Sequence, residues 1–166
     1  MSNIVKVRKY SYMELMKDTK ILKKTFKDLK ISSIGRSTMG KEIIYFRLGN
    51  GKKSVMINAT HHANEWQTSL VIMLFVEKYL YEKEKGIFYK SFNLTELWND
   101  VSLYIVPMVN PDGVDLVTEK IKKDSIYYKK CADISAKYSS IPFPSGWKAN
   151  INGVDFKNYQ PFCKVL

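Results

Sequence analysis

Histidine, cysteine and arginine are all scarce in this sequence of 166 residues. Two cysteines, Cys131 and Cys163, are too few for the disulfide framework of a small secreted domain. Because the first ten residues include Lys6, Arg8 and Lys9 and lack the apolar core of a signal peptide, we expect a reducing, cytoplasmic setting. The most apolar stretch, residues 69–76, is much shorter than the about 20 residues that cross a bilayer, so we expect no membrane partner.

Positive charge is abundant, but it is not concentrated. The net charge of +11 comes from lysines that are spread over the whole chain, with only three arginines among them. Proteins that bind nucleic acid usually gather basic residues on one face or along one helix. A nucleic-acid-binding protein is therefore an alternative that rests on charge alone, and we expect no nucleic-acid partner.

Apolar runs of strand and helix character alternate along the chain. With 45% hydrophobic residues, this length predicts a single domain over residues 1–166. A capping-box pattern at Ser11 and Glu14 predicts the start of the first helix. We expect helices over residues 12–27, 66–81, 94–101 and 127–138, and strands over residues 31–34, 43–48, 54–59 and 102–109. The pattern predicts an α/β fold, a mixed β-sheet with helices on both faces, in which the helix over 66–81 is buried on nearly all sides.

Polar residues follow two of the expected strands, at the ends where α/β sheets place their sites. Asn110 begins an Asn-Pro-Asp-Gly turn after one strand, and His62 and Glu65 lie three residues apart after another. A zinc ion accepts imidazole nitrogen and carboxylate oxygen, and this spacing allows both to reach it from one turn. A solvated pair is the simpler interpretation of the spacing alone. His61 is expected to point away from His62 on extended backbone, and it stays open as a ligand.

Several stretches, in this order and at this spacing, resemble the zinc carboxypeptidase family of the carboxypeptidase A type. They are residues 34–37 and 40–43, the Thr-His-His-Ala-Asn-Glu-Trp run at 60–66, the turn at 109–114, and the runs at 147–150 and 153–155. The resemblance implies that the chain forms the N-terminal part of the zinc carboxypeptidase fold, with zinc as cofactor and a peptide as substrate.

Four residues receive roles from this resemblance. His62 and Glu65 correspond to zinc ligands, and Asp155 corresponds to the carboxylate that orients His62 through its second ring nitrogen. Lys148 stands where the family commonly has an arginine that polarises the scissile carbonyl, and is the candidate catalytic residue. A lysine acts there as a point charge and not as a bidentate donor. The alternatives are a carboxylate in a turn at a strand end for Asp155 and an ordinary loop lysine for Lys148.

Substrate preference is implied by three further positions. Asn64 replaces the arginine of pancreatic-type enzymes and resembles the branch of γ-D-glutamyl-diamino-acid peptidases, which cut cell-wall peptides. Lys157 and Asn158 lie in the run that holds the substrate's terminal carboxylate in the family, although the surrounding sequence differs from the usual one.

The family's third zinc ligand, a histidine, and its general-base glutamate are expected beyond the last match, and no histidine follows His62 in this sequence. We therefore expect a truncated domain with impaired peptide hydrolysis. The alternative is a non-catalytic module that binds peptides or peptidoglycan. An incomplete sheet would also leave an exposed edge, through which the chain is expected to self-associate.

Overall fold

The computed structural model describes residues 3–89 and 92–155. The helices are α1 (Tyr12–Thr25), the short 3₁₀ turn η1 (Ala63–Glu65), α2 (Trp66–Glu84), α3 (Leu94–Asp100), α4 (Pro111–Val117) and α5 (Ile126–Ser135). The strands are β1 (Lys30–Arg36), β2 (Glu42–Leu48), β3 (Lys53–Asn58), β4 (Phe88–Tyr89), β5 (Phe92–Asn93) and β6 (Val101–Val106). The predicted α/β class and the order of the main elements are confirmed.

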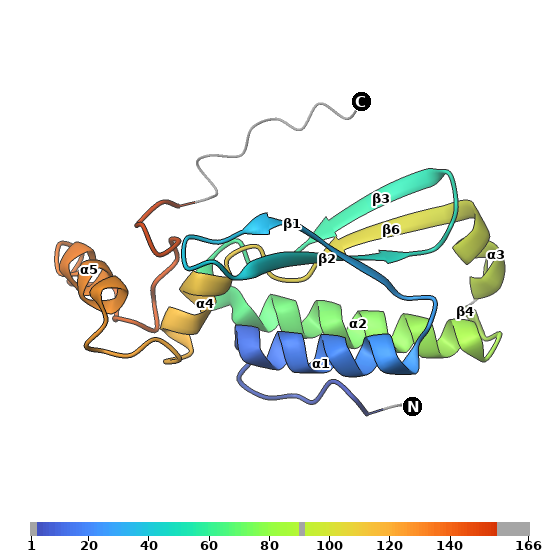
Figure 1. Cartoon of the computed structure of the whole chain (residues 1–166), viewed down its shortest axis with the longest axis horizontal. Helices are drawn as coiled ribbons and strands as arrows, with labels where there is room; N and C mark the ends of the chain where they lie inside the picture. Colours follow the sequence, from blue (N-terminus) through green and yellow to red (C-terminus); the bar gives the residue numbers. More distant parts are fainter. Residues whose placement is uncertain (1–2, 90–91, 156–166) are drawn as a thin grey trace.

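The main sheet has four strands in the order β1-β2-β6-β3 (Figure 1). β1 and β2 form an antiparallel hairpin, and β6 is antiparallel to β2 but parallel to β3. Ile105 of β6 is the partner of Phe46 on one side and of Ile57 on the other. A parallel pair needs a long crossover, which α2 and α3 provide between β3 and β6. The sheet is therefore mixed, as predicted.

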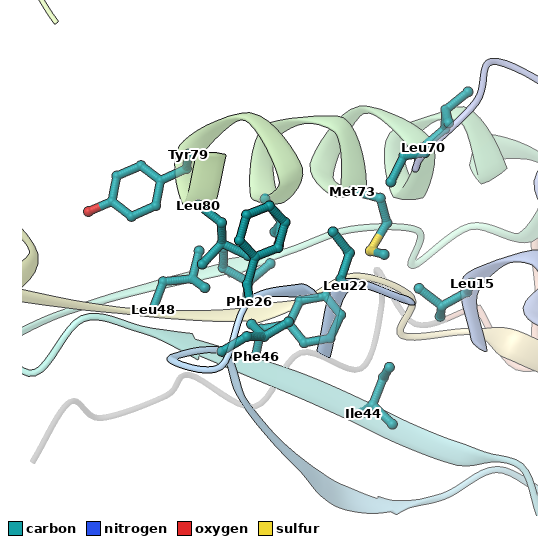
Figure 2. Close-up of a cluster of buried hydrophobic side chains, with 14 of the residues drawn as sticks. Leu15, Leu22, Phe26, Ile44, Phe46, Leu48, Leu70, Met73, Tyr79 and Leu80 are labelled. Carbon is teal, nitrogen blue, oxygen red and sulfur yellow. The ribbon is translucent and has the colours of Figure 1, made fainter. Parts of the chain in front are cut away.

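Helices α1 and α2 pack against one face of this sheet. Ile44, Phe46 and Leu48 alternate along β2 with half-buried residues and are fully or nearly fully buried. Figure 2 shows Leu22 of α1 and Met73 of α2 on the same side of β2 as Phe46. In residues 3–89 and 92–155 both long helices share this face (Figure 1).

The outer side of α2 is less buried than the sequence predicted. Met73 and Val76 face the core, but Val71 is 62% exposed and Phe75 is 39% exposed. The prediction of a helix buried on nearly all sides is therefore wrong. A continuous apolar run does not distinguish the two sides of a helix, because it carries no 3.6-residue alternation.

A second cluster of buried residues joins the later helices to the loop before the end of the described chain. It contains Leu116 of α4, Cys131 of α5 and the loop residues Trp147 and Ile151. Trp66, at the start of α2, packs against both this cluster and the main core. The two clusters are thus contiguous.

Helix α4 begins where the sequence predicted only a turn. Asn110 is its N-cap and its side-chain oxygen accepts from the Gly113 N–H at 3.1 Å. In the first turn, the Asp112 carboxylate accepts from the Ser37 hydroxyl and the Met39 N–H, both at 2.9 Å. α4 therefore fixes the β1–β2 hairpin turn. Among the helices described, none combines the length and apolar character needed to span a bilayer.

Candidate metal centre

The carboxyl ends of β3 and β6 lie side by side because these strands are parallel neighbours. Their last residues, Asn58 and Val106, are partners in the ladder. Pairing continues beyond them, since the Ala59 N–H donates to the Val106 carbonyl at 3.0 Å and the Asn110 N–H donates to the Thr60 carbonyl at 3.1 Å. This topology brings together the two polar segments that the sequence singled out.

Thr60 has a strained backbone conformation just before the two histidines. Its φ of 57° lies in the left-handed region, which a β-branched residue rarely adopts. The Thr68 hydroxyl accepts from the Thr60 N–H at 3.0 Å, and the Thr60 hydroxyl lies 2.6 Å from the Ser69 hydroxyl. Ser69 in turn donates to the Pro107 carbonyl at 2.6 Å. These contacts stabilise the strained turn and set the direction in which the next residues leave it.

His62 and Glu65 converge at the turn that follows. His62 is the N-cap of η1 and Glu65 is the last residue of that turn. Nδ1 of His62 lies 2.9 Å from Oε1 of Glu65. The His62 side chain is 15% exposed and the Glu65 side chain is 49% exposed, so the pair lies at the surface of a pocket with the imidazole on the inner side. The pair borders this pocket, and Glu65 is the more exposed partner.

The other ring nitrogen of His62 faces the end of the described chain. Nε2 is buried and lies 3.4 Å from Oδ1 of Asp155, without the geometry of a hydrogen bond. A buried ring nitrogen next to a carboxylate requires only a small shift to become a donor to it. With a metal ion in place of the hydrogen bond between Nδ1 and Glu65, a bond from Nε2 to Asp155 would fix the tautomer that leaves the Nδ1 lone pair free for the metal.

His61 points elsewhere, as expected from extended backbone. Its Nε2 lies 2.7 Å from Oδ1 of Asn58. Burial lowers the pKa of His61, and the neighbouring His62 lowers it further. Both histidines line a pocket of about 270 Å³ together with Glu65 and Thr68. The neutral form of His61 is favoured, and its ring is held by Asn58.

The pair His62 and Glu65 fits part of a zinc site. Two ligands that each bind zinc at about 2.0–2.2 Å lie roughly 3.3–3.6 Å apart in tetrahedral geometry, so the two atoms, 2.9 Å apart here, would separate by about half an ångström on binding zinc. A zinc site of this type uses three protein ligands. Among residues 3–89 and 92–155, no group of three His, Cys, Asp or Glu side chains could hold a metal ion. The described residues thus provide two donors.

Lys148 lies beside this centre on a loop. Its carbonyl accepts from the Ala63 N–H at 2.9 Å, and this hydrogen bond connects the loop to the turn that carries His62 and Glu65. The side chain is exposed, and it lines an open pocket of about 280 Å³ with Tyr138, Trp147 and Asp155. A lysine here could meet a carbonyl or carboxylate oxygen of a bound peptide.

The three residues predicted to bind substrate are in different situations. Asn64 is half-buried in η1, and its Oδ1 atom is buried with no hydrogen-bond partner in the described part of the chain. Lys157 and Asn158 lie outside the described residues. The roles of all three stay predictions.

Sequence reasoning missed the hydroxyl cluster and Asn58. Thr60, Thr68 and Ser69 are hydroxyl residues around an otherwise apolar strand and helix, which is the one local signal for such a cluster. Asn58 is the final residue of β3 and holds His61. Neither the left-handed Thr60 nor these contacts follow from residue type alone.

Comparison with known proteins identifies the family of this chain. The sequence profile of the zinc carboxypeptidase family matches residues 15–160. The chain belongs to the zinc carboxypeptidase family, and the predicted family resemblance is confirmed.

Two curated relatives match 92% of the chain. The γ-D-glutamyl-L-diamino acid endopeptidase 1 of Lysinibacillus sphaericus is 38% identical, and the match covers 38% of that protein. The uncharacterized protein YqgT of Bacillus subtilis (strain 168) is 32% identical, with 40% of its length covered. The chain therefore spans about two fifths of the length of these relatives.

Solved structures show the same fold. Bovine thrombin-activatable fibrinolysis inhibitor, in complex with tick carboxypeptidase inhibitor, has a TM-score of 0.60 and 20% identity over 85% of this chain and 36% of that one. Carboxypeptidase A from Helicoverpa armigera has a TM-score of 0.57 and 23% identity over 70% of this chain and 29% of that one. The carboxypeptidase fold predicted from the sequence is thus confirmed.

Proposed function

We propose that His62 and Glu65 bind zinc in a peptide-hydrolysing site of the metallocarboxypeptidase type. The observation that carries this proposal is the 2.9 Å separation of His62 Nδ1 and Glu65 Oε1, with the second nitrogen of His62 facing Asp155. Membership of the zinc carboxypeptidase family supports the choice of metal. When bound, zinc would polarise the scissile carbonyl and activate a water molecule.

Three further residues of this chain have proposed roles in the site. Asp155 would hold His62 in the tautomer that binds metal. The ammonium group of Lys148 would attract the carbonyl oxygen on which negative charge develops, acting as a point charge. Asn64, which lies in η1 between His62 and Glu65, would contact the peptide beside the zinc through its side-chain amide.

Cell-wall γ-D-glutamyl peptides are the proposed substrate class. Support comes from the relative that is a γ-D-glutamyl-L-diamino acid endopeptidase and from Asn64, which resembles that branch. We further propose that Lys157 and Asn158 contact a carboxylate of the peptide, since both can donate hydrogen bonds.

The third protein ligand and the general base would come from a further polypeptide segment. The sequence contains two histidines, and His61 is engaged with Asn58. On this proposal the 166 residues alone bind zinc weakly and hydrolyse peptides poorly, because two donors and an open water position do not complete the site.

Zinc titration with a chromophoric competitor tests the metal proposal. His62→Ala and Glu65→Gln should each abolish zinc binding, because each removes one of two donors. The matched control is His61→Ala, which removes the adjacent imidazole and should leave affinity unchanged. Equal zinc binding by the wild type and by His62→Ala would overturn the proposal, and loss in His61→Ala would reassign the ligand.

A second candidate is a peptide-binding or peptidoglycan-binding module without catalysis. It is favoured by the two-donor centre and by the pocket of about 280 Å³ beside Lys148. Binding of a muropeptide that is lost in Lys148→Ala, and that does not change when zinc is chelated, would support this candidate over the metal-dependent one.

We also propose that residues 1–166 form one domain in a reducing, cytoplasmic setting and that it self-associates through β3. Contiguity of the two core clusters through Trp66 supports one domain. The buried thiol of Cys131 is compatible with reducing conditions. Met56, 64% exposed on the edge strand of the described sheet, supports self-association.

A further inference from the structure

The side chain of Asn110 is buried between three segments that meet at the candidate metal centre. The residue is 2% exposed. Its Nδ2 atom donates to the His61 carbonyl and to the Ala149 carbonyl, both at 3.1 Å, and the Lys148 carbonyl lies at 3.5 Å. Its Oδ1 atom accepts from the Gly113 N–H at 3.1 Å. Both amide hydrogens and the oxygen are therefore in use.

The two nearer carbonyls belong to residues next to a group of the proposed site. His61 directly precedes His62, and Ala149 directly follows Lys148. The Lys148 carbonyl also accepts from the Ala63 N–H at 2.9 Å. The Asn110 backbone adds a third connection, since its N–H donates to the Thr60 carbonyl at 3.1 Å. One residue thus joins the turn that carries the ligand pair to the loop that carries Lys148.

Helix capping alone does not explain an asparagine here. An N-cap needs only an acceptor for an N–H of the first turn, and Asp and Ser provide one as well as Asn does. The two donor bonds from Nδ2 require an amide. An aspartate would bring a carboxylate oxygen against two carbonyl oxygens, so it would keep the cap and break the connection between the segments.

Gly113 is needed for the same arrangement. A Cβ atom at this position would lie 2.7 Å from Cβ of Ala63 and 2.7 Å from Oδ1 and Nδ2 of Asn110. The close approach lets the Asn110 amide reach across to the ligand turn. The Asn-Pro-Asp-Gly run therefore begins α4 and also supports the site.

We propose that Asn110 is a positioning residue that fixes the place of the His62–Glu65 pair relative to Lys148, acting through the carbonyls of His61 and Ala149. This inference rests on the proposed zinc role of the pair. Because the pair holds only two donors, small displacements of His62 should change zinc affinity strongly.

The test compares Asn110→Asp and Asn110→Ser, which keep the cap acceptor, with Ile44→Val, a variant of a buried β2 residue that takes no part in these hydrogen bonds. Zinc affinity is measured by competition with a chromophoric chelator, and stability by urea unfolding. The Asn110 variants should lose zinc affinity about tenfold or more, as losses of groups that orient ligands do. Ile44→Val should lose stability and keep zinc affinity. If Asn110→Asp does not fold, Asn110→Ser decides.

A second measurement does not depend on zinc. Hydrogen exchange of the Ala63 amide, which is bonded to the Lys148 carbonyl, should speed up in the Asn110 variants while exchange of the Phe46 amide does not. Unchanged Ala63 exchange, or a loss of zinc affinity no greater than that of Ile44→Val, would overturn the inference. If His62→Ala binds zinc as tightly as the wild type, the proposed function fails, and the exchange rate of the Ala63 amide alone then decides the role of Asn110.

Discussion

Nε2 of His62 lies 3.4 Å from Oδ1 of Asp155, while Nδ1 of the same ring faces Glu65. Asp155→Asn removes the charge that favours a proton on Nε2. We expect zinc affinity to fall about 10-fold to 100-fold with little change in stability, because the Asp155 side chain is 40% exposed. Competition with a chelator and thermal unfolding measure the two effects.

Asp133→Asn is the matched control for this experiment. Asp133 is an exposed carboxylate on α5, so the variant has the same change in net charge without the contact to His62. If both variants lose zinc affinity equally, general electrostatic attraction explains the effect and Asp155 has no orienting role.

The hydroxyl cluster that holds Thr60 should be important for stability. Ser69 is fully buried, and Ser69→Ala leaves the Pro107 carbonyl without its donor and removes the contact to the Thr60 hydroxyl. We expect the free energy of unfolding to fall by about 1–3 kcal/mol. Urea unfolding measures this. Ser54→Ala, at an exposed position on β3, should change stability little. An equal loss of stability in Ser54→Ala would show that the buried hydrogen bonds of Ser69 do not explain the effect.

Local pattern was enough to predict the elements that surround the site. Alternating burial along β2 and the capping pair Ser11 and Glu14 are visible in short windows of sequence, and both occur in the structure. The spacing of His62 and Glu65 is equally local, and the structure brings their side chains together.

Contacts between distant segments could not be predicted in the same way. The Asn110 amide reaches carbonyls 38 and 39 residues away, which depends on how α4 meets the loop. The place of β6 between β2 and β3 decides that β3 is an edge, and strand order is not encoded in any single strand. For this reason the exposed side of α2 and the left-handed Thr60 were also beyond prediction.

Tyr10 is expected to make the folded protein less stable at alkaline pH. It is fully buried, and its hydroxyl donates to Asp18 at 2.9 Å, while Asp18 also accepts from Arg8 at 2.7 Å. Burial raises the pKa of Tyr10, and the charge of Asp18 raises it further. The unfolded chain therefore releases this proton above pH about 10 while the folded chain keeps it, so stability falls as pH rises beyond that value.

We expect this group to reduce the free energy of unfolding by about 1.4 kcal/mol for each pH unit above pH 10. Tyr10→Phe should be less stable at neutral pH because it loses the hydrogen bond, but its decline above pH 10 should be shallower. Urea unfolding at pH 8 and pH 11 measures both effects. Tyr138→Phe, at a position that is 59% exposed, should keep the slope of the wild type. Parallel curves for the wild type and Tyr10→Phe would contradict this account.

Self-association through β3 can be tested with a single charge. In the described sheet, β3 pairs on one side only, with β6, and Met56 and Val55 are 64% and 46% exposed. A lysine at an edge resists pairing because its ammonium group would lose water at the interface. We therefore expect the wild type to show concentration-dependent dimers in sedimentation velocity, and Met56→Lys to remain monomeric over the same concentrations.

Val7→Lys is the matched control. It also introduces a lysine, at a position that is 83% exposed and outside the sheet, and it should behave like the wild type. A wild type that stays monomeric at every concentration, or equal loss of dimers in both variants, would rule out β3 as the interface.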